Sequence, residues 1–147
     1  MMDFGKLGFG FLCLFHVDPD DPGDVDLETT KKMVDLFLQR GFRYFDTAYI
    51  YLGGKSEGYL RQALTERYPR EAYMIADKLP CGYLNKGMRA QEIFSEQLER
   101  CGVDYFDVYL LHGLDAEDAA FAEQAGCFDF LQEQKKLGHI RYTGFSF

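Results

Sequence analysis

The sequence repeats a pattern in which a helix-like stretch ends at a glycine and a strand-like stretch follows at once. Gly41 precedes FRYFDTA, Gly102 precedes VDYFDVYLLH and Gly138 precedes HIRYTGFSF. Helices often end on a left-handed glycine, because other residues reach that conformation only with a clash of the Cβ atom. Strands and helices therefore alternate along the chain, a pattern typical of a parallel sheet.

The apolar pattern predicts five strands and four helices in an α/β fold. The predicted helices are Leu27–Arg40, Ser56–Tyr68, Met88–Cys101 and Glu117–Leu137, the last one broken at Gly126. The predicted strands are Leu7–Leu14, Phe42–Phe45, Tyr73–Ala76, Tyr105–Leu111 and Ile140–Phe145. An open doubly wound sheet and a (β/α)8 barrel both fit this order. A full barrel takes about 250 residues, so we expect 147 residues to hold only part of one.

Composition excludes several classes of function. The net charge of −8 argues against a surface that binds duplex nucleic acid, which needs clustered Lys and Arg. No run approaches the roughly 20 apolar residues of a membrane span, and the N-terminus lacks the features of a signal peptide. We interpret the four cysteines, which are Cys13, Cys81, Cys101 and Cys127, as reduced thiols of a cytoplasmic protein. Their scattered spacing predicts neither a metal site nor an iron–sulfur cluster.

Three different ionisable residues stand at the ends of predicted strands. Asp46 follows the second strand, Lys78 the third and His112 the fourth, and Tyr51 lies five residues after Asp46. Each alone has a structural explanation, as a helix cap, a surface lysine or a packed histidine. Because active sites of parallel α/β folds form at the carboxyl ends of the strands, the set together indicates a functional site.

These side chains suit the reduction of a carbonyl group. A free tyrosine is a poor acid at neutral pH, and a nearby ammonium favours its ionised form. A carboxylate holds that ammonium, and a histidine can donate a hydrogen bond to a carbonyl oxygen. No protein side chain donates hydride, so this chemistry implies a nicotinamide or flavin cofactor.

Other interpretations compete with this one. A carboxylate-based hydrolase would use Asp46 with Glu57, but Glu57 stands at a predicted helix start, where an acidic residue favours the helix dipole. The acidic segment Val17–Asp26 fits a solvated loop better than a cation site. A glycine pattern that starts at Gly8 lacks its third glycine and disfavours a dinucleotide-binding turn.

Six segments together resemble the aldo-keto reductase family. They are KLGFG at residues 6–10, GFRYFDTAYIY, GGKSE, ADKLP, YLLH and IRYTGFSF. The resemblance implies a TIM (β/α)8 barrel that uses NADPH or NADH to reduce aldehydes and ketones. It implies Tyr51 as the proton donor, Lys78 and Asp46 as the pair that favours the phenolate, and His112 as the residue that orients the carbonyl.

The same resemblance implies contacts with the cofactor. It assigns them to Gly10, Phe11, Asp46 and Ser146, with Ser146 beside the nicotinamide carboxamide. Phe147 stands where the family often has an asparagine. No metal is implied.

The resemblance further implies that residues 1–147 are the N-terminal portion of the barrel, without strands six to eight and most of the cofactor site. Similar proteins continue into a longer barrel and sometimes an iron–sulfur domain. The expected function is therefore a reductase for small carbonyl compounds. The alternative is a truncated, non-enzymatic or interaction protein that binds no cofactor. Open sheet edges would favour self-association.

Overall fold

The computed structural model describes residues 4–18, 20–21, 23–84 and 87–147, and it contains one five-stranded parallel sheet. The strands are β1 (Gly8–Gly10), β2 (Tyr44–Asp46), β3 (Met74–Leu79), β4 (Phe106–Leu111) and β5 (Ile140–Phe145). Each strand pairs with the next one in the sequence, in the order β1-β2-β3-β4-β5. A doubly wound sheet reverses its strand order, whereas a barrel winds in one direction. The order therefore identifies the fold as part of a (β/α)8 barrel.

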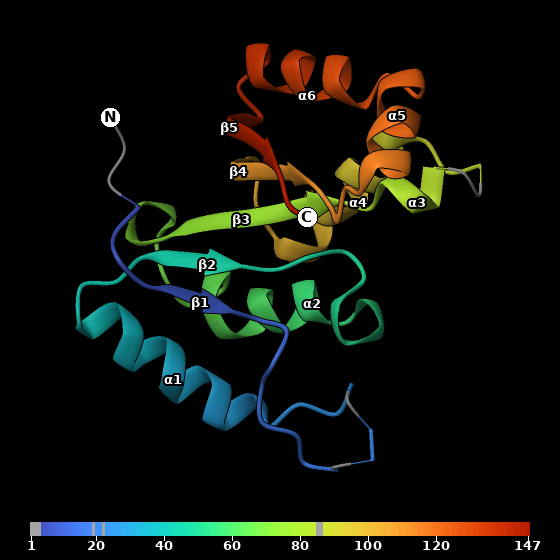
Figure 1. Cartoon of the computed structure of the whole chain (residues 1–147). Coiled ribbons are helices and arrows are strands. Elements are labelled where there is room, and N and C mark those ends of the chain that lie inside the picture. The colour runs from blue at the N-terminus through green and yellow to red at the C-terminus, as the bar shows by residue number, and fades with distance from the viewer. Residues whose placement is uncertain (1–3, 19, 22, 85–86) are drawn as a thin grey trace.

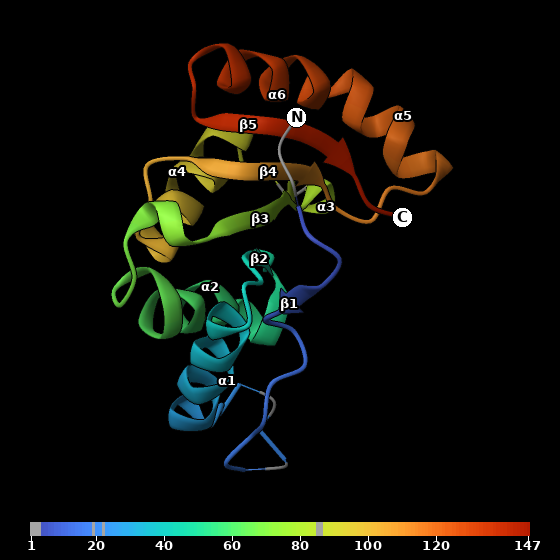
Figure 2. The same ribbon diagram turned by 90° about the vertical axis from the view of Figure 1, so that its left-hand side faces the viewer.

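The helices lie on one side of this sheet. They are α1 (Leu27–Gln39), α2 (Ser56–Leu60), α3 (Cys81–Leu84), α4 (Ala90–Cys101), α5 (Ala116–Gln124) and α6 (Cys127–Lys136). The strands form an arc with α1, α2, α4 and α6 on its outer side, while the N-terminal segment lies on the open side (Figures 1 and 2). The predicted break between α5 and α6 is confirmed at Gly126, which has a φ of 71°.

Several predicted boundaries are wrong. The strand predicted over Leu7–Leu14 is limited to β1, after which the chain leaves the sheet. The helix predicted over Ser56–Tyr68 is regular only to Leu60 and then continues as a π-helical turn, Arg61–Thr65. The strand predicted over Tyr73–Ala76 extends to Leu79 as β3, so Lys78 lies inside the strand rather than after it.

Aromatic side chains fill the space between the sheet and the helices. Phe45 of β2 and Phe37 of α1 pack with ring centroids 5.1 Å apart, and Phe94 of α4 packs on Tyr109 of β4 at 4.9 Å. Phe45, Phe94 and Tyr109 are almost completely buried, and Phe37 is 8% exposed. Burying aromatic rings in edge contact contributes both apolar area and a favourable ring geometry. These contacts fix the outer helices against the strands that carry the predicted site.

A pair of carboxyl groups is buried in the same layer. Glu57 of α2 and Asp77 of β3 are both fully buried, and Asp77 hydrogen-bonds to Glu57. Glu57 also accepts hydrogen bonds from Gln97 at 3.0 Å and from Arg100 at 3.2 Å. Burial and the neighbouring Glu57 charge raise the pKa of Asp77 well above its ordinary value, and burial raises the pKa of Glu57 as well. Because Arg100 balances Glu57, Asp77 is the partner that retains a proton.

No helix in the described part of the chain is long and apolar enough to cross a membrane.

We predict that Asp77→Asn stabilises the protein, and increasingly so as the pH rises. A carboxyl whose folded pKa is raised binds more protons when folded, so its contribution to stability declines above the unfolded pKa of about 4. Asparagine keeps the oxygen that accepts from the Lys78 N–H and supplies a permanent donor to Glu57. We expect a gain of about 1–3 kcal/mol at pH 8, the usual cost of an unfavourable buried polar group.

Urea unfolding at several pH values measures this gain. The matched control is Asp104→Asn, since Asp104 is exposed and should change stability by less than about 0.5 kcal/mol. A gain for Asp77→Asn that is absent at pH 8, or equal at acidic and alkaline pH, would contradict the assignment of the proton to Asp77.

Candidate active site

The ammonium group of Lys78 is the centre of the predicted site. Its Nζ atom donates to Asp46 Oδ1 at 2.7 Å and to the Thr47 carbonyl oxygen at 2.8 Å. The Lys78 side chain is 6% exposed, whereas that of Asp46 is 31% exposed. A buried ammonium must be paired and hydrogen-bonded to remain charged. The end of β2 supplies both acceptors, so the ion pair joins β2 to β3.

Tyr51 approaches the same ammonium from the turn that follows β2. The Lys78 Nζ atom lies 4.7 Å from the centroid of the Tyr51 ring. Tyr51 opens a short 3-10 turn, Tyr51–Gly54, in which Leu52 has a φ of 53°. A non-glycine residue rarely adopts this left-handed conformation, and such strain is common at functional sites. The Leu52 side chain is buried, and its packing anchors the turn that presents Tyr51.

His112 lies beside Tyr51 and is the fourth residue of the candidate site. Its ring centroid lies 5.5 Å from that of Tyr51, with the two rings nearly perpendicular at 79°. The His112 backbone N–H donates to the Leu79 carbonyl oxygen at 2.9 Å, so the residue follows β4 beside the end of β3. Burial, and then the charge of Lys78, lower the pKa of His112. A neutral imidazole is thus favoured here.

The hydrogen of that imidazole can be assigned. The Nδ1 atom of His112 is buried and has no hydrogen-bond partner among the described residues. An orphaned N–H group is rarer in proteins than an under-used acceptor. We therefore place the hydrogen on Nε2, where it is available as a donor.

A second tyrosine lies near Asp46 but suits proton donation less well. Tyr44 stands two residues before Asp46 in β2. Burial, together with the charges of Asp46 and Asp107, raises the pKa of Tyr44 to about 12. A phenol with that pKa releases its proton less readily than an ordinary tyrosine. Tyr44 therefore serves as a natural comparison for Tyr51.

The residues predicted to contact a cofactor lie at both edges of the sheet. Gly10 ends β1, is exposed, and has open space where a Cβ atom would stand, which fits the close approach of a bound group. Phe11 is fully buried, and its carbonyl oxygen accepts from Ser56 Oγ at 2.9 Å. Ser146 follows β5, where its Oγ atom accepts from the Gly113 N–H at 2.9 Å. A hydroxyl that accepts in this way can still donate its own hydrogen. Their roles in cofactor binding stay predictions.

Sequence reasoning missed three contributors to this site. The Thr47 carbonyl is a backbone group, which no side-chain pattern indicates. Ser56 donates its only hydroxyl hydrogen to the Phe11 carbonyl and therefore accepts from Thr47 Oγ1 at 2.7 Å, so it joins the ends of β1 and β2 to α2. Gln97 contacts the backbone of Lys78. Glu57, the predicted partner of Asp46 in a hydrolase, instead lies buried against Gln97 and Arg100.

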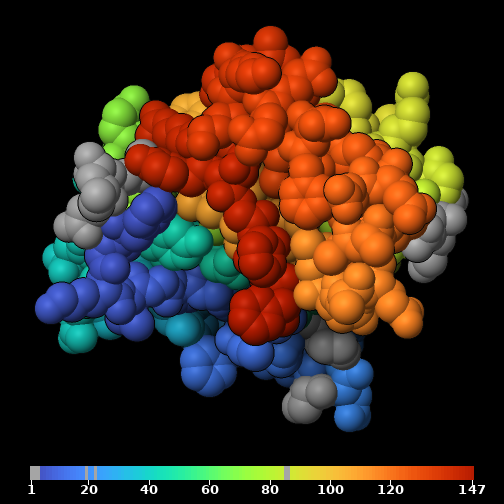
Figure 3. All heavy atoms as spheres, turned by 45° about the horizontal axis from the view of Figure 1, so that its top comes forward, coloured from blue at the N-terminus to red at the C-terminus, as the bar shows by residue number. Residues whose placement is uncertain are grey.

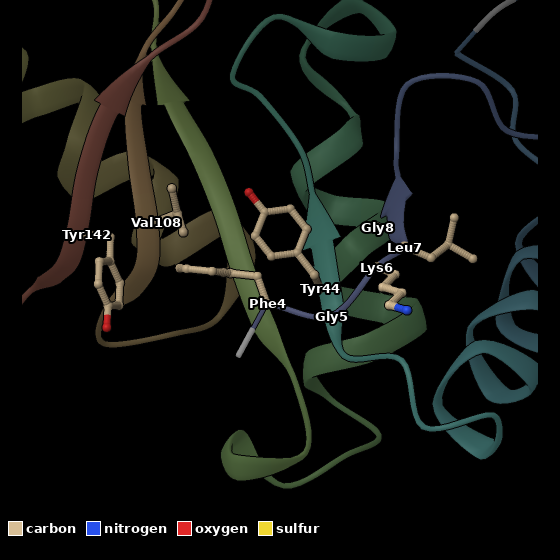
Figure 4. A pocket seen from close by; sticks show the side chains of 8 residues that line it. All are labelled: Phe4, Gly5, Lys6, Leu7, Gly8, Tyr44, Val108 and Tyr142. Carbon is tan, nitrogen blue, oxygen red and sulfur yellow. The ribbon is translucent and has the colours of Figure 1, made fainter. Parts of the chain in front are cut away.

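A hollow in the described surface is a separate feature. Its volume is about 520 Å³. It lies between the N-terminal segment and the sheet, as the close-up of its lining side chains shows (Figure 4), and the space-filling view shows the N-terminal segment in blue on the same face as β5 in red (Figure 3). Phe4 reaches into it and makes edge contacts with Tyr44 at 5.9 Å and with Tyr142 at 5.3 Å. It borders the beginnings of β1 and β2, whereas Asp46, Lys78 and His112 lie at the opposite ends of their strands.

Known proteins resemble this chain in sequence and in fold. The model of the aldo/keto reductase family matches residues 6–147. An aldo-keto reductase of Mycobacterium avium (strain 104) is 33% identical over 120 residues, which are 81% of this chain and 40% of that protein. The holo form of the aldo-keto reductase AKR11C1 from Bacillus halodurans has a TM-score of 0.67 and 27% identity, and the match covers 95% of this chain and 45% of that one.

A third comparison supports the fold alone. The structure of an aldo-keto reductase from Klebsiella pneumoniae in complex with NADPH has a TM-score of 0.72 at 21% identity, over 95% of this chain and 44% of that chain. This chain thus spans about two-fifths of the length of the curated relatives it matches first. The family match extends from Lys6 through the ion pair of Lys78 to the last strand, and the chain belongs to the aldo/keto reductase family.

Proposed function

We propose that this chain carries the proton-transfer residues of an NAD(P)H-dependent reductase of aldehydes and ketones. One observation supports the proposal most strongly. A buried lysine ammonium is held by Asp46 and lies against the ring of Tyr51, which in turn contacts His112. Reduction of a carbonyl group needs a proton for an oxygen on which negative charge grows, and this group of residues suits that need.

Tyr51 gives its hydroxyl proton to the carbonyl oxygen of the substrate. The Lys78 ammonium stabilises the negative charge that is left on the phenol oxygen. Asp46 keeps the ammonium charged and in place through the 2.7 Å ion pair. His112, neutral and protonated on Nε2, donates a hydrogen bond that orients the carbonyl and stabilises its developing charge.

A nicotinamide cofactor, when bound, supplies the hydride that the carbonyl carbon receives. Gly10, Phe11, Asp46 and Ser146 would hold it along the carboxyl ends of the strands. The open space at Gly10 and the capacity of the Ser146 hydroxyl to donate a hydrogen bond fit such a group.

We further propose that residues 1–147 form the N-terminal portion of a reductase barrel, and that strands six to eight lie outside them. The chain spans about two-fifths of its curated relatives, which supports this proposal. Most residues that grip the cofactor's pyrophosphate and adenosine phosphate would lie in those strands. Four free cysteines support a location in the reducing cytoplasm.

We predict that, in the complete reductase barrel, Tyr51→Phe lowers kcat for an aromatic aldehyde by about 10²- to 10⁴-fold, the usual contribution of a general acid. NADPH consumption measures the rate. The phenyl ring retains the contacts with Lys78 and His112, so KM and the thermal unfolding midpoint should change little.

Tyr44→Phe is the matched control for this variant. It removes a hydroxyl from the same strand region, near the same carboxylate, and should leave kcat within a few-fold of the unmodified protein. Full activity of Tyr51→Phe, or an equal loss of kcat in Tyr44→Phe, would contradict the assignment of Tyr51 as the proton donor.

We predict that NADPH and NADH bind the 147-residue chain with similar affinity, measured by the change in reduced-nicotinamide fluorescence. NADPH differs from NADH only by a phosphate on the 2′-hydroxyl of the adenosine. We place the residues that bind this phosphate outside this chain. A preference for NADPH of tenfold or more would show a phosphate site within these residues. No saturable binding by a folded chain would favour the alternative of a non-enzymatic or interaction protein.

We predict that the isolated chain self-associates through its open sheet edges. The β5 edge exposes Tyr142 and Phe145, and unpaired strand edges invite pairing with another chain. Light scattering after size-exclusion chromatography should detect a dimer or larger species, and Phe145→Lys should shift it towards the monomer. Phe128→Lys on α6, also at an exposed position, is the control. A monomer at all concentrations would refute this prediction.

A further inference from the structure

The backbone ladder between β2 and β3 ends just before Lys78. Met74 N–H donates to the Arg43 carbonyl at 2.7 Å, and the Ala76 carbonyl accepts from Thr47 N–H at 3.0 Å. Alternate residues of β3 therefore turn their backbone groups towards β2, as in any parallel pair. The last β2 pairing joins Asp46 to Ala76, and the chain then enters the loop that leads to α2 (Figure 1). Lys78 is the next residue in this alternation.

At Lys78, two side chains take the place of β2 as hydrogen-bond partners of the backbone. The Lys78 N–H donates to Asp77 Oδ1 at 2.8 Å, and the Lys78 carbonyl accepts from Gln97 Nε2 at 3.1 Å. Asp77 and Gln97 are both fully buried. A buried backbone group without a partner costs about as much free energy as a lost hydrogen bond. Because Asp77 and Gln97 supply the hydrogen bonds that β2 does not make, β2 can leave the sheet before Lys78 without this cost.

Gln97 is itself held in one orientation. Its Nε2 atom also donates to Glu57 Oε1 at 3.0 Å, and its Oε1 atom accepts from the Tyr109 hydroxyl. Both amide hydrogens and the amide oxygen are thus used, and a flipped amide would break all three contacts. The position of the Lys78 carbonyl is therefore defined by side chains of α2, α4 and β4.

We propose that Gln97 is a positioning residue that fixes Lys78 for its contact with Asp46 and Tyr51. If β2 continued its ladder along Lys78, the Thr47 carbonyl would not be free for the ammonium. The fold instead ends β2 at Asp46 and uses Gln97 to satisfy the Lys78 carbonyl from behind the sheet. The catalytic meaning of this inference rests on the proposed function, but the positioning itself can be tested without turnover.

The test is the acetylation rate of Lys78 in Gln97→Met, followed by peptide mass spectrometry. Methionine fills the space but cannot donate, so the Lys78 carbonyl loses its partner and the ammonium is held less firmly. We expect Lys78 to react about tenfold faster, which is the upper end of the effect of one hydrogen bond. Exposed Lys136 is the internal reference. Gln91→Met, at an exposed position of the same helix, is the matched control and should leave the rate unchanged.

Buried Cys127 distinguishes local release from general unfolding. Its reaction with a thiol reagent should stay slow in Gln97→Met, and a parallel rise at Cys127 would attribute the effect to unfolding and overturn the proposal. Unchanged acetylation of Lys78 together with a lower unfolding midpoint would also overturn it, because Gln97 would then be structural only.

A second variant decides the case in which Gln97→Met does not fold. Tyr109→Phe keeps the buried ring but removes the hydroxyl that orients the Gln97 amide, so Lys78 acetylation should rise by a few-fold. No rise in a folded Tyr109→Phe would count against the proposal. If the protein reduces carbonyls, both variants should lower kcat more than they raise KM. A faster Lys78 reaction in a protein without reductase activity would retain the positioning role and reject only the proposed function.

Discussion

The burial of a charged ammonium at the end of β3 is the interaction on which the site depends. Removing such an ion from water costs several kcal/mol unless close acceptors replace the lost hydration. Asp46 and the Thr47 carbonyl are the two close acceptors, and both belong to the segment where β2 ends. β2 must therefore stop pairing at Asp46, since a longer ladder would use the Thr47 carbonyl elsewhere. The short strand is a requirement of the site and not a defect of the sheet.

The alternation of side chains along a strand places an ammonium and a carboxyl group on opposite faces of β3. Lys78 points to the inner side, towards Asp46 and Tyr51, and Asp77 points to the helices, towards Glu57 and Cys101. Successive side chains of a strand face opposite ways, so neighbours in sequence can serve different layers. The outer layer holds a protonated acid, an amide and a balanced carboxylate. This polar layer supports β3 from the helix side, while the inner face holds the ammonium of Lys78 in its ion pair with Asp46.

Much of the fold could be predicted from local signals. Gly41 and Gly102 mark helix ends directly before strands, because their left-handed conformation is a property of the residue itself. The residues of the site could also be predicted, since Asp46 and His112 follow apolar runs that had to be strands. The role of Gln97 could not be predicted, because a polar residue on a helix is expected to face solvent unless its partner on the sheet, here the Lys78 carbonyl, is known. The strained Leu52 turn is equally hidden, since its conformation is imposed by packing and not by its own preference.

The two halves of the candidate site depend on the fold in different ways. Lys78 lies on β3 and His112 directly after β4, while Asp46 and Tyr51 lie at and after the end of β2. Pairing of these three adjacent strands brings all four residues together. Gly10 and Ser146 instead lie at β1 and after β5, the two outer edges of the sheet. Their separation is set by the curvature of the whole arc, which accumulates over every strand pair. The proposed proton transfer would therefore depend on local strand pairing. The proposed cofactor contacts at Gly10 and Ser146 would depend on the curvature of the whole arc, which the proposed closing strands of a barrel would help to hold.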